Sequence, residues 1–131
     1  MDPLRLFAVI SWISLPTVMF GGYSLLRLIG EERLTPFQHT YFRAGHAHAG
    51  VLLVLSLVFY QYLERTGLSG GVKIAASAAF VVGVLAQSGG FFLHMLVGQP
   101  GAPSAGTLVT IAGAVVLAAC CLLLAYGLIR S

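Results

Sequence analysis

Residues 74–129 decide the fold, and they read IAASAAFVVGVLAQSGGFFLHMLVGQPGAPSAGTLVTIAGAVVLAACCLLLAYGLI, 56 residues without Asp, Glu, Lys or Arg. A helix needs about 20 apolar residues to cross the hydrocarbon of a bilayer, so this run is too long for one span. It breaks at 98–104, GQPGAPS, where Gly and Pro favour a turn. The run therefore predicts two transmembrane helices, at about 73–97 and 104–129.

The chain on the N-terminal side of this run adds two more spans. Uncharged runs of 20 residues (44–63) and 21 residues (6–26) each match the length of one span. Only 8% of the 131 residues are charged, whereas a soluble domain carries roughly 25%. We expect helices at about 6–28 and 42–63, with Pro16 kinking the first. A cleaved signal peptide is the alternative for the first segment, but the segment is long and lacks a small-residue cleavage site.

Short connections make neighbouring helices antiparallel. The sequence therefore predicts an all-α fold, a polytopic membrane protein built as an antiparallel four-transmembrane-helix bundle, with one domain over 1–131. Four basic residues flank the spans on the side of the termini and three on the other side, which favours both termini in the cytoplasm of a bacterial-type inner membrane. These residues are scattered along the helix ends, which argues against a nucleic acid partner. The residues on the side of the termini are Arg5, Arg65, Lys73 and Arg130, and those on the other side are Arg27, Arg33 and Arg43.

The histidines are the polar side chains of greatest interest in so apolar a chain. His39 falls in the longest connection, 29–41, where it is expected to serve the loop. His46 and His48 lie near the start of the second helix, and His94 lies near the end of the third. Because these helices are antiparallel, we expect the last three imidazoles to lie about one turn inside the same membrane face. An ionisable group inside a membrane is a functional candidate by default.

The surroundings of these histidines are small. His46 and His48 are roughly 200° apart around a helix, so they cannot easily bind one metal ion together. Alanines and glycines at 44, 45, 47, 49 and 50 remove side-chain bulk, which permits close helix packing or the approach of a flat macrocycle. We expect Gly50 to contribute to such a surface, and Arg43 to pair with a propionate of the macrocycle.

The third helix is expected to complete the site. Gln87, Phe91 and His94 share one helix face, and Gly89 and Gly90 are expected to open space beside it. Imidazoles beside a thinned helix surface suit a porphyrin, whose iron accepts an imidazole nitrogen. The alternative is that the histidines only bond to loops or headgroups and the glycines only pack.

The segments RAGHAHAG (43–50) and AQSGGFF (86–92), together with the four-span size, resemble the styrene oxide isomerase family. The resemblance implies a trimer of four-helix chains that holds haem b near subunit boundaries and uses ferric iron as a Lewis acid to open an epoxide. It implies that His48 is the axial ligand and that Gln87 matches a family asparagine. The chain departs from the family where Val54 replaces an asparagine and Phe91 replaces a tyrosine.

Several functions therefore stay open. The first is a haem b protein with His48 as its axial ligand, an isomerase-like enzyme for a small apolar epoxide-like substrate that Gln87 and Phe91 help to enclose. The second is an electron-transfer cytochrome in which His48 and His94 both bind iron and a redox partner is needed. A cofactor-free packing subunit of a larger membrane complex is a third, and a small multidrug transporter is disfavoured because no carboxylate lies within a span. One chain offers little room for a porphyrin, so we expect a homo-oligomer in lipid, with a trimer favoured by the resemblance.

Overall fold

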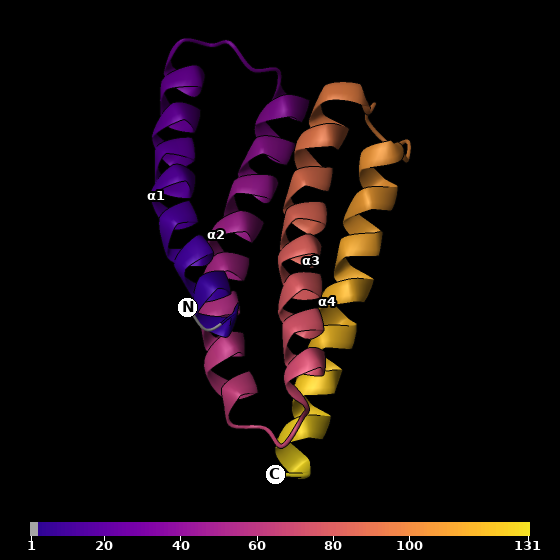
Figure 1. Cartoon of the computed structure of the whole chain (residues 1–131). Coiled ribbons are helices and arrows are strands. Elements are labelled where there is room, and N and C mark those ends of the chain that lie inside the picture. Colours follow the sequence, from indigo (N-terminus) through magenta and orange to yellow (C-terminus); the bar gives the residue numbers. More distant parts are fainter. Residues whose placement is uncertain (1–2) are drawn as a thin grey trace.

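Four helices make up almost all of the computed structural model, which describes residues 3–131 (Figure 1). They are α1 (Pro3–Gly30), α2 (Pro36–Glu64), α3 (Gly70–Val97) and α4 (Ala105–Ile129). Each helix is long and apolar enough to cross a membrane. The predicted all-α bundle of four potential transmembrane helices is confirmed, and residues 1 and 2 of the expected domain lie outside the described part.

The helices pack in chain order (Figure 1). α3 and α4 make the most extensive contact, α2 packs on α3, and α1 packs mainly on α2. Within the described residues, α1 and α4 do not pack against each other, so the bundle is open between its first and last helices. α1 continues through Pro16, and it bends in Figure 1, as a proline that removes one helical hydrogen bond allows.

Glycines bring α3 and α4 close together. A Cβ added at Gly90 would meet Thr110, and one added at Gly106 or Gly113 would meet backbone atoms of α3. At Gly83 the same addition would lie 2.8 Å from Leu117. Small residues allow transmembrane helices to approach until their backbones touch, and van der Waals contact then holds them together. This interface therefore depends on the absence of side chains at four positions.

The second helix begins at Pro36, six residues before the expected position 42. Thr35 caps it, because the Thr35 hydroxyl accepts a hydrogen bond from the Gln38 amide at 3.2 Å, and the Gln38 side chain accepts one from the Thr35 amide at 3.0 Å. Proline at the first helical position supports the same start. The expected loop at 29–41 therefore shortens to 31–35, and His39 lies in the first turn of α2 and not in a loop.

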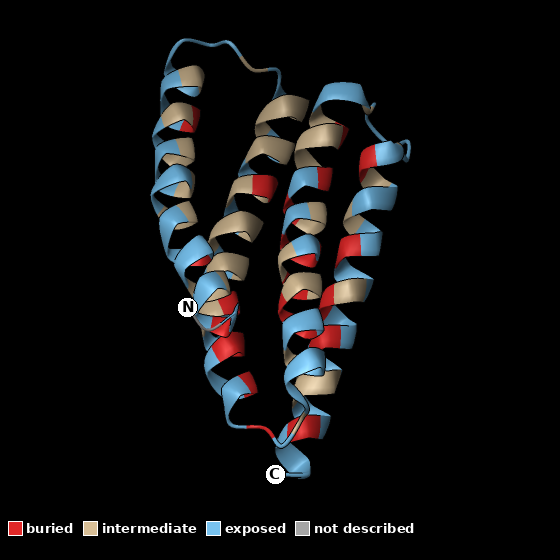
Figure 2. Ribbon diagram, viewed as in Figure 1, coloured by how far each residue is buried: buried red, intermediate tan, exposed pale blue. Residues whose placement is uncertain are grey.

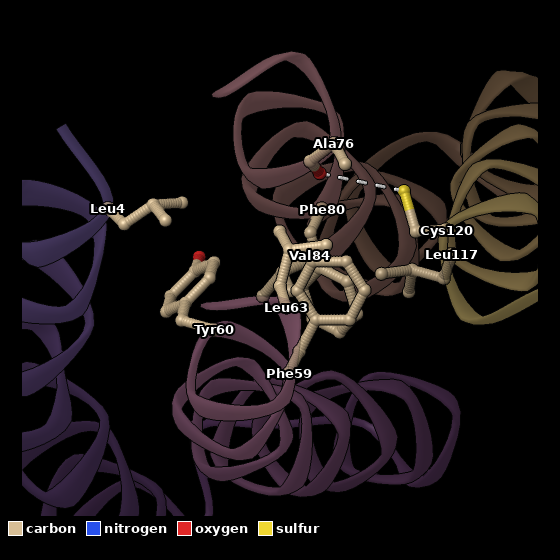
Figure 3. Close-up of a cluster of buried hydrophobic side chains, with 9 residues drawn as sticks. All are labelled: Leu4, Phe59, Tyr60, Leu63, Ala76, Phe80, Val84, Leu117 and Cys120. Carbon is tan, nitrogen blue, oxygen red and sulfur yellow. Dashed lines mark hydrogen bonds between the residues drawn. The ribbon is translucent and has the colours of Figure 1, made fainter. Parts of the chain in front are cut away.

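A buried hydrophobic cluster, which includes the rings of Phe59, Tyr60 and Phe80, packs the helices together in the half of the bundle that carries the termini (Figure 3). Phe59 of α2 and Phe80 of α3 stack with ring centroids 4.4 Å apart. In Figure 2 the buried positions of α2 lie mostly in this lower half, while its upper half is largely of intermediate exposure. The histidine-bearing half of α2 is therefore the less tightly enclosed one.

Candidate functional site

His46 faces α1. A Cβ added at Gly22 would lie 3.0 Å from the His46 Nε2 atom, and one added at Gly21 would lie 3.5 Å from its Nδ1 atom. The two glycines therefore leave a recess in α1 that the imidazole of His46 fills.

His48 lies on the other side of α2, against α3. Its Nδ1 atom is 2.8 Å from the carbonyl oxygen of Ala44, one turn earlier in the same helix. A carbonyl accepts hydrogen bonds but cannot donate, so Nδ1 carries the proton of this bond, and in the neutral ring Nε2 keeps its lone pair. The ring of Phe91 lies 4.6 Å away, centroid to centroid. The expected divergence of His46 and His48 is confirmed, and His48 is held in the tautomer of a metal-binding imidazole.

His94 is buried and connects α3 to the start of α4. Its Nδ1 atom lies 2.7 Å from the Ser104 hydroxyl and 3.3 Å from the Thr107 hydroxyl. The Ser104 hydroxyl also accepts a hydrogen bond from the Gly106 amide, as the N-cap of α4. One nitrogen of His94 is therefore engaged in holding the α3–α4 connection.

The three intramembrane histidines do not converge. A series of ring contacts links His94 to Tyr41 (4.3 Å between centroids), Tyr41 to Phe91 (6.5 Å) and Phe91 to His48. Tyr41 and Phe91 therefore stand between the imidazoles of His94 and His48. Within residues 3–131, no group of three or more His, Cys, Asp or Glu side chains could hold a metal ion. His46, His48 and His94 therefore do not form one site, and the common depth expected for them stays a prediction.

The other predicted site residues, Arg43, Gln87 and Phe91, differ in their exposure and in the contacts that their side chains make. Arg43 is exposed and makes no ion pair within the described range. Gln87 is half-buried, and its side chain makes no hydrogen bond to any described residue, although its main chain packs against Gly113. Phe91 is half-buried between Tyr41 and His48.

The glycines differ from expectation in one case. Space beside Gly89 is open, because a Cβ there would meet no atom within 4 Å. Gly90 does not open a surface for a ligand, because Thr110 and the carbonyl of Gly106 already occupy that position. Gly50 faces α1, where a Cβ would lie 3.7 Å from Val18.

The sequence did not reveal a cavity of about 370 Å³ between α1, α2 and α3. Its walls are mostly apolar, but six hydroxyl groups line it, from Ser11, Ser14, Thr17, Ser56, Tyr60 and Ser88. The available signal was helical spacing, since Ala49, Leu53, Ser56 and Tyr60 share the face of α2 that begins with His46. Hydroxyl side chains in helices commonly bond to their own backbone, so their presence alone indicated no site.

Comparison of the chain with protein-family profiles, with curated proteins and with solved structures finds no match.

Proposed function

We propose that this chain is a membrane protein that binds haem b, with Nε2 of His48 as the axial ligand. The observation that carries the proposal is the hydrogen bond from Nδ1 of His48 to the Ala44 carbonyl at 2.8 Å. Histidines that bind metal almost always donate their other ring N–H to a carbonyl or carboxylate, which fixes the ring and increases its basicity. A haem supplies four nitrogens of its own, so it needs one protein ligand and not a cluster.

Residues around His48 fit a flat, apolar group with acidic edges. Ala44 and Ala47 leave little bulk beside the imidazole on α2, and Phe91 offers a ring face on α3. Arg43, exposed and without an ion pair among the described residues, is available to a propionate at the membrane surface. Gln87 offers an unpaired carboxamide about one turn deeper than Phe91.

When bound, ferric haem supplies a Lewis acid that polarises an oxygen atom of a small apolar substrate. An epoxide-like substrate from the lipid phase is the class we propose, with the Gln87 carboxamide orienting its oxygen and Phe91 packing on its apolar part. Both side chains are half-buried, so they border lipid as well as protein.

We further propose that the chain works as a homotrimer in a bacterial-type inner membrane with both termini in the cytoplasm. A haem on the outer side of His48 would need a second wall, which a neighbouring copy supplies. Arg65 and Arg130, at the end with the termini, lie over the rings of Tyr62 and Tyr126 at 5.3 and 5.2 Å. Such basic and aromatic groups belong at the membrane interface, and basic residues favour its cytoplasmic side.

Geometry favours this reading over a cytochrome with two histidine ligands. Tyr41 and Phe91 lie between the imidazoles of His48 and His94. His94 is also buried, at 5% exposure, whereas His48 is only half-buried.

The test is the haem content of protein purified in mild detergent, measured as iron and as pyridine haemochrome. Wild-type protein should be coloured, with a high-spin spectrum that changes on addition of cyanide. His48→Ala should lose the haem, whereas His39→Ala, a control on the same helix, should retain it, with both variants eluting as the wild type does. Colour that survives in His48→Ala refutes the ligand assignment. A colourless, iron-free wild type refutes haem binding and favours a packing subunit.

A further inference from the structure

The cavity between α1, α2 and α3 lies on the face of α2 opposite His48, so it is separate from the proposed haem site. Its volume of about 370 Å³ lies in the lower part of the range typical of small-molecule pockets, roughly 300–1,000 Å³. Ile10 and Leu85 line it and are 41% and 67% exposed, so its mouth opens to the lipid phase between α1 and α3.

The hydroxyl protons of this cavity are almost all in use. Ser14 donates to the Ile10 carbonyl at 2.8 Å, and Thr17 donates to the Ser14 carbonyl at 2.6 Å. Ser88 likewise donates to the Val84 carbonyl at 2.6 Å. A serine or threonine hydroxyl has one proton to give. These three groups therefore cannot donate to a molecule in the cavity without breaking a bond to their own helix.

The hydroxyl protons of the two buried serines, Ser11 and Ser56, are also engaged in hydrogen bonds. Ser56 donates to the Leu53 carbonyl at 2.7 Å, so in its contact with Ser11, 2.8 Å between oxygens, Ser11 must be the donor. Both protons are thus committed. Ser11 and Ser56 offer a ligand only acceptor lone pairs.

Tyr60 is the exception. It is 3% exposed, and its hydroxyl makes no well-formed hydrogen bond among residues 3–131; the Ser11 and Ser56 hydroxyls are near enough to interact with it, but at poor geometry. Figure 3 shows this hydroxyl on the side toward α1, away from the Phe59–Phe80 stack. A buried phenol whose proton is poorly satisfied is costly in an apolar medium, so a group that accepts this proton in good geometry would be held strongly.

We propose that the cavity binds a small apolar ketone or quinone from the lipid phase, with the Tyr60 hydroxyl donating a hydrogen bond to its carbonyl oxygen. The apolar walls hold one or two rings. The Tyr60 hydroxyl sets the position of the oxygen, because among the hydroxyls that line the cavity it is the one whose proton is not committed to a well-formed hydrogen bond.

The test uses benzophenone, a ketone that on illumination inserts into nearby C–H bonds. Wild-type protein in lipid nanodiscs is labelled, and the modified peptides are identified by mass spectrometry. Labels should gather on cavity positions of α1, α2 and α3. Excess acetophenone should compete about 2- to 10-fold better than ethylbenzene, the factor that one net hydrogen bond supplies.

Two variants distinguish the effect of the Tyr60 hydrogen bond from the effect of the cavity volume. In Tyr60→Phe, acetophenone and ethylbenzene should compete equally, while Tyr62→Phe, whose ring is 45% exposed on the same helix, should behave as the wild type. Ala49→Phe, which fills the cavity, should lose the cavity labels altogether. Haem content is measured separately, so its absence leaves this test unchanged.

Any of three results would overturn the proposal. The first is an even spread of labels over lipid-facing residues such as Val82. The second is a preference for acetophenone that persists in Tyr60→Phe. The third is a wild type in which acetophenone competes no better than ethylbenzene, which is the behaviour of a cavity that holds water alone.

Discussion

Gly113→Ala is expected to force α4 away from α3. The added Cβ would lie 2.8 Å from the Cα atom of Gln87 and 2.9 Å from the carbonyl carbon of Ala86, whereas carbon atoms in good contact are about 3.5–4.0 Å apart. Because both neighbours are backbone atoms of a helix, no side-chain rotation can relieve the overlap. The helices must therefore separate by roughly 1 Å.

The cost of that separation follows from what holds the interface. A gap of about 1 Å forfeits a quarter to a half of each dispersion contact, and the contacts at Gly83, Gly90 and Gly106 lie along the same interface. We expect a loss of about 1–3 kcal/mol, the usual range for an overpacked core. Gly89→Ala is the matched control, because a Cβ there meets nothing within 4 Å and alanine favours a helix over glycine.

A cysteine of the chain reports the separation. Cys120 is 5% exposed, with its Sγ atom 3.7 Å from the Ala76 carbonyl of α3, whereas Cys121 is exposed. With Cys121 replaced by serine, a thiol-reactive dye added during heating in detergent detects when Cys120 becomes accessible. Gly113→Ala should lower the midpoint by about 4–12 °C, and Gly89→Ala should leave it unchanged or raise it. Equal midpoints for the two variants would refute the packing account.

Thr35→Ala should lower the same midpoint by a few degrees, since it removes the capping box with Gln38, worth about 1 kcal/mol. Glu32→Gly should raise the midpoint, because Glu32 has φ 53°, a left-handed conformation that costs a non-glycine residue about 1 kcal/mol or more. Combining His48→Ala with Tyr60→Phe should give the sum of the single effects. Haem content should follow position 48, and the preference for acetophenone should follow position 60. Loss of both properties in either single variant would contradict the separation of the two sites.

The number and order of the helices could be predicted because they depend only on the length of uncharged runs. The start of α2 was placed too late because charge and hydropathy locate the hydrocarbon and not the helix. α2 continues past Arg43 to the cap at Thr35. The Thr-Pro-x-Gln sequence carried that information, since it is a capping box with proline at the first position.

The relation between helices was harder to predict. The divergence of His46 and His48 follows from the pitch of one helix, but the level of His94 relative to α2 depends on how two helices slide past each other. The contrast between Gly89 and Gly90 has the same origin. They are neighbours roughly 100° apart, and nothing in their sequence indicates which one α4 would cover.

α2 therefore has two chemically distinct faces over the same length of membrane. Toward α1 it presents His46 and, further along, the hydroxyl of Tyr60 beside an apolar cavity. Toward α3 it presents the imidazole of His48, fixed by its own backbone. A helix 29 residues long can separate two such sites because its backbone satisfies its own hydrogen bonds, so each face is free to carry a different polar group. The stacked pair Phe59–Phe80 holds α2 against α3 at the far end of the helix, so the two sites are expected to act independently.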